Sequence, residues 1–250
     1  NPNLTILATH SLDVPTPWTV GALLRGPSVA TRIHAARRLG NRRHNWVMDA
    51  LTEALMKDSF WGVSAAAAKA LGKIGTPAAK EGLLKAKKHK HPKVRRAIAR
   101  ALGSFRDESV GKALASWLKK GDASYFVEGE VAKSLGKTRY EPGFKALKNA
   151  LSRDSWNEVV RGGVIQGLAQ HDTPEAVQAI LPFVRRGVAE PARVAAMSAV
   201  ASTSAIREQV WPEFEILLKE KGYRIQLALV NAAAQLGGAK GEGILAELRD

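Results

Sequence analysis

The feature that most constrains this 250-residue sequence is a leucine followed by a small residue, which recurs about every 32 positions. The small residue is glycine at every recurrence but one, where it is alanine. The leucines are Leu39, Leu71, Leu102, Leu135, Leu168 and Leu236. The first four steps are 32, 31, 33 and 33 residues, and the last step of 68 spans two repeats, one of them degenerate near 200–201. A period of this length is typical of stacked supersecondary units.

Each period has the pattern of two amphipathic helices. Apolar residues recur every three or four positions in Val94, Ile98 and Leu102, and a second such series begins at Val110. We interpret each repeated leucine as the last core contact of a helix, and the glycine after it as a left-handed C-terminal cap. Alanines such as those at 65–68 in the first helix of a unit let stacked helices approach closely. The prediction is an all-α superhelix of the HEAT type, with about seven helical hairpins.

The repeats divide the chain into a leader, residues 1–26, and a solenoid, residues 27–250. The leader has a short β-branched stretch at 4–9, interpreted as the end of a preceding β-sandwich, and a predicted short helix at 18–24. Asp58, Asp122 and Asp154, followed by Ser or Ala, are expected to satisfy free amides at helix starts. The seven predicted units are 27–58, 59–90, 91–122, 123–155, 156–190, 191–222 and 223–250.

The sequence motifs of known catalytic and metal sites are absent from this chain. Without cysteine, disulfides, thiolate zinc sites and cysteine nucleophiles are excluded. No two histidines have the spacing of a zinc-binding helix, and His89-Lys90-His91 lies among lysines that repel a cation. No apolar run is long enough to span a bilayer. We therefore expect a chain that is not an enzyme, uses no cofactor or metal, has no membrane partner and resides in the cytoplasm.

Charge is distributed very unevenly along the chain. Residues 27–155 contain 27 basic and 11 acidic side chains, a net charge of +16, whereas residues 156–250 have a net charge of −1. Such a density fits a docking patch for an acidic partner, either a protein surface or nucleic-acid phosphates, and it also fits a face that only confers solubility. The candidate partner-binding residues are Lys85, Lys87, Lys88, Lys90, Lys93, Arg95, Arg96 and Arg100.

Several segments resemble a known family. The segments are Asn3-Leu4-Thr5-Ile6-Leu7, Pro17-Trp18, residues 32–40, Phe60-Trp61-Gly62-Val63, Ser124-Tyr125-Phe126-Val127-Glu128 and Ser155-Trp156-Asn157. They are similar to the C-terminal HEAT-repeat domain of aminopeptidase-N-type zinc metallopeptidases, over residues 3–190. The resemblance implies a domain that packs on an adjacent catalytic domain and helps enclose its substrate cavity. None of the family's catalytic motifs occurs here, and the start at Asn1 without Met is expected for a fragment of a longer protein.

Two alternatives remain. HEAT-like alkylpurine DNA glycosylases are also basic, so the chain could bind nucleic acid, although its aromatic residues lie at repeat starts and do not alternate with the basic run. HEAT-like repeats also occur in phycobilin lyases, but no cysteine or recognisable pigment site is present.

Overall fold

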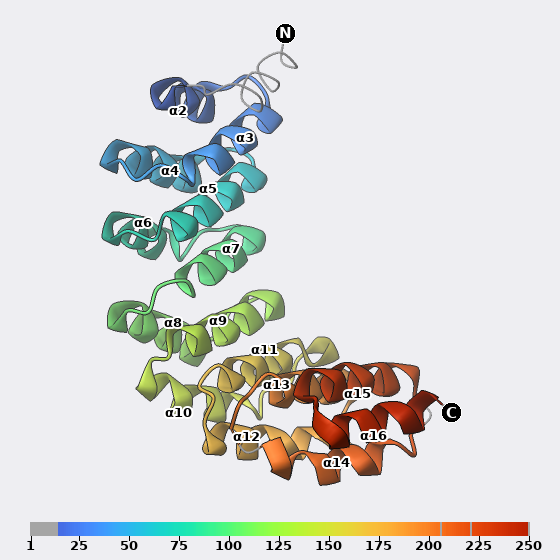
Figure 1. The fold of residues 1–250 in the computed structure, drawn as a ribbon. Coiled ribbons are helices and arrows are strands. Elements are labelled where there is room, and N and C mark those ends of the chain that lie inside the picture. The colour runs from blue at the N-terminus through green and yellow to red at the C-terminus, as the bar shows by residue number, and fades with distance from the viewer. Residues whose placement is uncertain (1–14, 206, 221, 250) are drawn as a thin grey trace. The chain divides into compact units, whose positions relative to one another are not determined.

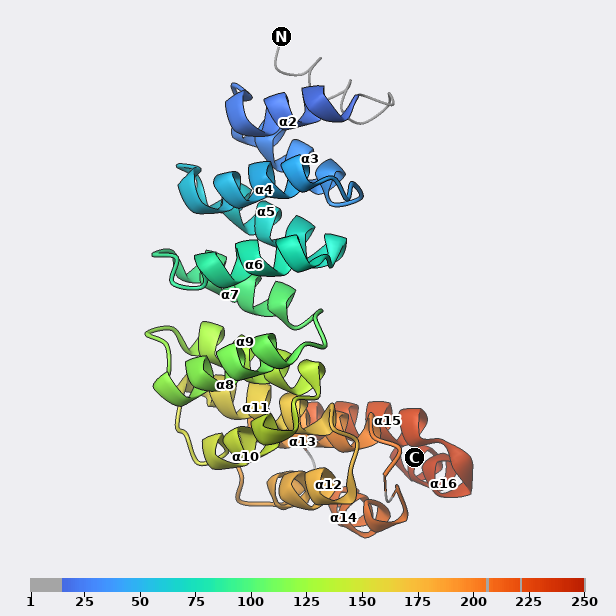
Figure 2. The same cartoon turned by 90° about the vertical axis from the view of Figure 1, so that its left-hand side faces the viewer.

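The structure is a computed structural model that describes residues 15–205, 207–220 and 222–249. Over these residues every regular element is a helix, and they form the predicted series of seven helical hairpins (Figures 1 and 2). The all-α, HEAT-like fold class is therefore confirmed. The strand expected at 4–9 lies outside the described residues. By internal contacts the chain divides into two compact units, residues 1–114 and 115–250.

The first unit contains two layers of helices. The first helices of its hairpins, α3, α5 and α7, pack side by side, and α2, α4 and α6 form a second layer beside them, on the left in Figure 1. The leader helix α2 contacts both α3 and α4, and its Leu23 is fully buried. The bounds are α2 (Thr16–Arg25), α3 (Val29–Leu39), α4 (Asn45–Lys57), α5 (Trp61–Ile74), α6 (Pro77–Ala86) and α7 (Pro92–Leu102), and α8 (Glu108–Lys120) crosses the division. We call α3, α5 and α7 the first-helix layer.

The second unit continues the series of hairpins, and two of its second helices, α12 and α14, have only 7 residues each. Its first helices α9, α11, α13 and α15 pack in sequence order. Helices α9, α11 and α15 each contact the helix that follows, whereas α14 contacts α15. The second helix of the fifth hairpin ends in a 3-10 turn. The bounds are α9 (Tyr125–Thr138), α10 (Glu141–Ala150), η1 (Trp156–Glu158), α11 (Val159–Ala169), α12 (Pro174–Ile180), η2 (Leu181–Val184), α13 (Glu190–Ala201), η3 (Arg207–Gln209), α14 (Trp211–Leu217), α15 (Tyr223–Leu236) and α16 (Gly238–Arg249).

The glycines after the repeated leucines have a different role from the predicted one. Gly40 and Gly103 have right-handed φ and ψ angles, and at Gly72 and Gly136 the helix continues beyond the glycine. Of the five repeated glycines only Gly237 has a positive φ, of 66°. Its ψ of −163° lies outside the left-handed helical region, so the prediction of left-handed caps was wrong at all five positions.

These glycines are instead required where two first helices touch. A Cβ atom at Gly72 would lie 2.9 Å from the Cα of Ala101 on the next first helix, and one at Gly40 would lie 3.3 Å from the Cα of Ala70. In the second unit the contact is backbone to backbone, since a Cβ at Gly136 would collide with the carbonyl of Gly167. The small residue therefore sets how closely neighbouring hairpins stack.

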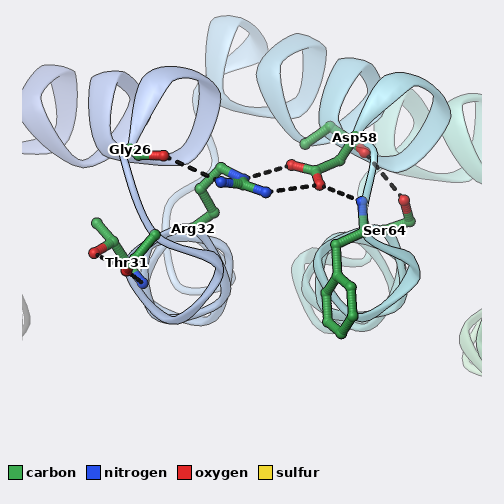
Figure 3. Close-up of polar contacts among 8 residues, drawn as sticks. Gly26, Thr31, Arg32, Asp58 and Ser64 are labelled. Atoms are coloured by element: carbon green, nitrogen blue, oxygen red, sulfur yellow. Dashed lines mark hydrogen bonds and ion pairs between the residues drawn. The ribbon is translucent and has the colours of Figure 1, made fainter.

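A second residue, an arginine, also recurs near the start of several first helices. Its side chain links the helix to the turn before it. Its guanidinium donates to a preceding carbonyl oxygen in four hairpins, through the pairs Arg32–Gly26, Arg95–His89, Arg161–Leu151 and Arg193–Val184. Arg32 also donates to both carboxylate oxygens of Asp58, at 2.8 and 3.2 Å (Figure 3). Arg193 binds Glu220 in the same bidentate way. Such pairs join the start and end of one hairpin.

Side-chain caps at the helix starts follow the sequence closely. The Thr76 and Thr173 hydroxyls accept from the amides of Ala79 and Ala176, and a proline follows each threonine. The Asp58 carboxylate accepts from the Phe60 amide at 2.9 Å, as predicted, while also binding Arg32.

Adjacent glycines on α11 test the contact between first helices. A Cβ at Gly163 would collide with the backbone of Gly129 on α9, whereas one at Gly162 would meet only the Cβ of Ala195 at 3.7 Å. Gly163→Ala should lower the free energy of unfolding by about 1–3 kcal/mol through overpacking. Gly162→Ala should leave it unchanged or raise it by up to about 1 kcal/mol, because alanine favours helix. Urea denaturation followed by circular dichroism measures both, and equal effects would contradict the assigned contact.

The buried arginine pair gives a second stability prediction. Arg32→Ala removes the guanidinium donor of the Gly26 carbonyl and of the Asp58 carboxylate, which keeps only its bond from the Phe60 amide. Only 9% of the Asp58 side chain is exposed. We expect a loss of about 1–3 kcal/mol in the free energy of unfolding. Lys57→Ala is the control, since Lys57 and Glu53 form an exposed i,i+4 pair worth about 0.5 kcal/mol or less. An Arg32→Ala protein as stable as the control would show that the pair is not structural.

Candidate interaction surface

The first-helix layer of the first unit contains basic but no acidic residues. Helices α3, α5 and α7 have nine arginines and lysines among them and no aspartate or glutamate. The second layer differs in charge, because α4 contains Asp49 and Glu53, and α6 contains Glu81. In the second unit two of the first helices, α9 and α13, also mix signs, with Glu128 and Glu130 in α9 and Glu190 in α13. More than half of the net charge of +16 in residues 27–155 thus lies on this one layer.

The eight predicted binding residues fall into two groups in the structure. Lys85, Lys87, Lys88 and Lys90 lie at the end of α6 and in the loop after it, and the other four lie on α7. Arg95 donates to the carbonyls of His89 and Lys90, at 3.0 and 2.8 Å, so its guanidinium holds the loop. The role of Arg95 is therefore mainly structural, and we do not assign it to the binding of a partner.

Aromatic rings occupy the start of this layer. The rings of Trp61 and His91 stack with centroids 5.3 Å apart, and the Lys93 ammonium lies 4.4 Å from the centre of the Trp61 ring. Trp61 is thus already covered by two side chains of the chain itself. Burial lowers the pKa of the adjacent His89, and the charges of Lys90 and Arg95 act in the same direction.

A groove of about 400 Å³ runs between α5 and α7. Small residues form its floor, Ala65 and Gly72 from α5 and Ala97 and Ala101 from α7. Its charged lining consists of Lys69, Lys73 and Arg100, and Ser104 adds a hydroxyl; no carboxylate lines it. Neither Lys69 nor Lys73 forms an ion pair with any residue that the structure describes. The lining of the groove therefore suits an anionic group.

Sequence reasoning found Arg100 but missed Lys69 and Lys73. Charge density along the sequence selects the 85–100 run, because its eight cations lie within 16 residues, and it passes over two lysines that stand near alanines. The repeat itself contained the signal. Arg37, Lys69 and Arg100 each stand two residues before the repeated leucine, so the fold brings them to equivalent places on adjacent helices.

No group of three or more metal-ligating side chains lies close together in the residues that the structure describes. No helix in the described part of the chain has the length and hydrophobicity needed to cross a bilayer.

Comparison with known proteins identifies the repeat. A family model described as HEAT repeats matches residues 16–90 and 81–159, which together are more than half of the chain. The protein is thus a helical-repeat protein, and it belongs to the HEAT-repeat family. No curated protein gives a significant sequence match.

Solved structures show the same fold at low identity. A chain in the complex of CpcE and CpcF of phycocyanin lyase from Nostoc sp. PCC7120 has a TM-score of 0.55 and 16% identity, with 96% of each chain covered. Human deoxyhypusine hydroxylase has a TM-score of 0.47 and 14% identity, covering 100% of this chain and 93% of its own. At these identities the likeness concerns the fold alone. None of these matches supports the resemblance to aminopeptidases.

Proposed function

We propose that this chain is a non-catalytic HEAT-repeat module that binds an acidic protein surface through the first-helix layer of its first unit. The observation that carries the proposal is the charge of α3, α5 and α7, nine basic residues without one acidic residue. Exposed members include Arg37, Lys69, Lys73 and Arg96. An acidic partner would neutralise a face on which like charges repel one another.

A face that only confers solubility would have a different charge pattern. Solubility requires net charge but does not depend on which layer contains it, and mixed signs avoid a strong local field. Here the second helices α4 and α6 carry both signs, whereas the layer with the groove carries one. The segregation to one layer favours binding over solubility.

A protein surface fits this layer better than a nucleic acid does. Single-stranded nucleic acids stack their bases on exposed aromatic rings. Among Phe, Tyr and Trp, helices α3, α5 and α7 contain only Trp61, and its ring is covered by His91 and Lys93. The groove floor of alanine and glycine offers no ring either. A protein partner is compatible with the fold, since the similar chain in phycocyanin lyase occurs in a complex of CpcE and CpcF.

The finer form of the proposal concerns a neighbouring domain. The segments around residues 3–40 and 124–128 resemble aminopeptidase-N-type proteins. If the chain is part of such a protein, the acidic surface belongs to an adjacent catalytic domain. The sequence resemblance is its support, and the charge argument holds for any acidic protein.

The proposal predicts which lysines matter. Lys69→Glu/Lys73→Glu reverses two charges in the groove, and Lys85→Glu/Lys88→Glu reverses two exposed charges at the end of α6, so both variants change net charge equally. Binding of fluorescent poly-L-glutamate, measured by anisotropy near physiological salt, should weaken at least about tenfold in the first variant, roughly 1.4 kcal/mol. The second variant should lose less than about threefold. Circular dichroism checks that both fold.

The same assay separates the alternatives. Equal losses in the two variants would show that net charge alone is sensed, and a larger loss in the second would move the site to the 85–90 loop. A labelled 20-base-pair DNA duplex serves as the competing ligand. Duplex binding that is tighter than poly-L-glutamate binding, and that falls steeply with salt, would favour nucleic acid and overturn the proposal.

A further inference from the structure

We infer that the first-helix layer of the first unit recognises an extended acidic segment of polyproline-II type, with an acidic residue at every third position. This inference rests on the proposed function and adds the form of the bound segment. Its basis is the row formed by Arg37 on α3, Lys69 on α5 and Arg100 on α7, which we call the basic row. All three side chains are exposed.

The fold fixes the period of the basic row. Its members are 32 and 31 residues apart, one in each hairpin, at the same position relative to the repeated leucine. Neighbouring first helices are in close contact at Gly40 and Gly72, where added Cβ atoms would lie 3.3 and 2.9 Å from backbone atoms of the next helix. Packed helices lie about 8–10 Å apart, and contacts between small residues belong to the short end of that range. The row therefore presents one cation about every 8–10 Å.

Few peptide conformations match this spacing on one face. A polyproline-II helix rises about 3.1 Å per residue with three residues per turn, so every third side chain points the same way, about 9 Å further on. In a β-strand the side chains on one face lie about 6.6 Å or about 13 Å apart. An acidic residue at every third position of a polyproline-II segment thus places one carboxylate opposite each member of the basic row.

Between α5 and α7 the basic row is bordered by an open groove that has further donors. The groove between α5 and α7 is lined by the small residues Ala65, Gly72 and Ala97. Their short side chains let the backbone of a bound peptide approach the two helices. Lys73 and Ser104 lie four residues after Lys69 and Arg100, and line the same groove. A polyproline-II segment makes no internal hydrogen bonds, so its carbonyl oxygens are available to such donors.

Two peptides of identical composition test the inference. One has the sequence Glu-Pro-Pro repeated four times, and the other has four consecutive glutamates followed by eight prolines. Both are capped, labelled and equally charged, and both favour polyproline II. We expect the periodic peptide to bind the whole chain at least about fivefold more tightly at low salt. Equal affinities, or tighter binding of the clustered peptide, would overturn the inference and leave the acidic-partner proposal standing.

Variants locate the peptide on the basic row. Lys69→Gln should reduce the preference for the periodic peptide to less than about twofold, whereas Lys85→Gln, an exposed lysine on α6, should leave it intact. Ala97→Leu raises the groove floor without changing charge, and should weaken periodic-peptide binding at least about threefold. A preference that survives both Lys69→Gln and Ala97→Leu would place the segment elsewhere. If neither peptide nor poly-L-glutamate binds, the proposed function itself fails.

Discussion

The contact between the first helices of successive hairpins is the constraint on which the rest of the structure depends. Gly40 and Gly72 allow α3, α5 and α7 to approach until backbone and Cβ atoms touch, and glycines on both α9 and α11 do the same in the second unit. Because the contact occurs once per repeat, it fixes the period of the stack. It also decides where every other residue of the repeat is placed relative to its counterpart on the next helix.

The basic residues of the first unit divide into two kinds with different partners. Arg32 and Arg95, near the helix starts, use their guanidinium groups on turn carbonyls, and Arg32 also binds a carboxylate that is mostly buried. Arg37 and Lys69, further along the helices, are exposed on a layer without carboxylates. A single count of charge hides this difference. Position within the repeat separates the cations that hold the fold from those available to a partner.

The sequence predicted the fold better than it predicted the site. The period, the two helices per repeat and the threonine caps at Thr76 and Thr173 follow from local chemistry that acts within a few residues. The role of Gly72 could not be read locally, because its reason is Ala101 on another helix. Lys69 and Lys73 were missed for the same cause, since they join Arg100 only across α5 and α7. The lysines at 85–90 stood out in the sequence because they are close together along the chain. Closeness along the chain does not show that they lie near a groove.

The two units differ in charge, because the second unit has 18 basic and 16 acidic side chains, a net charge of only +2. A hairpin contacts mainly its immediate neighbours, so its surface residues can change without disturbing distant ones. In α9 the position of Lys69 is taken by Lys133, but Glu128 and Glu130 accompany it, and the charge of one sign ends there. The length of surface available to a charged ligand is therefore encoded by how many consecutive repeats lack an acid on their first helix. Gain or loss of one hairpin would alter that length in a fixed increment, independently of the stability of the remaining stack.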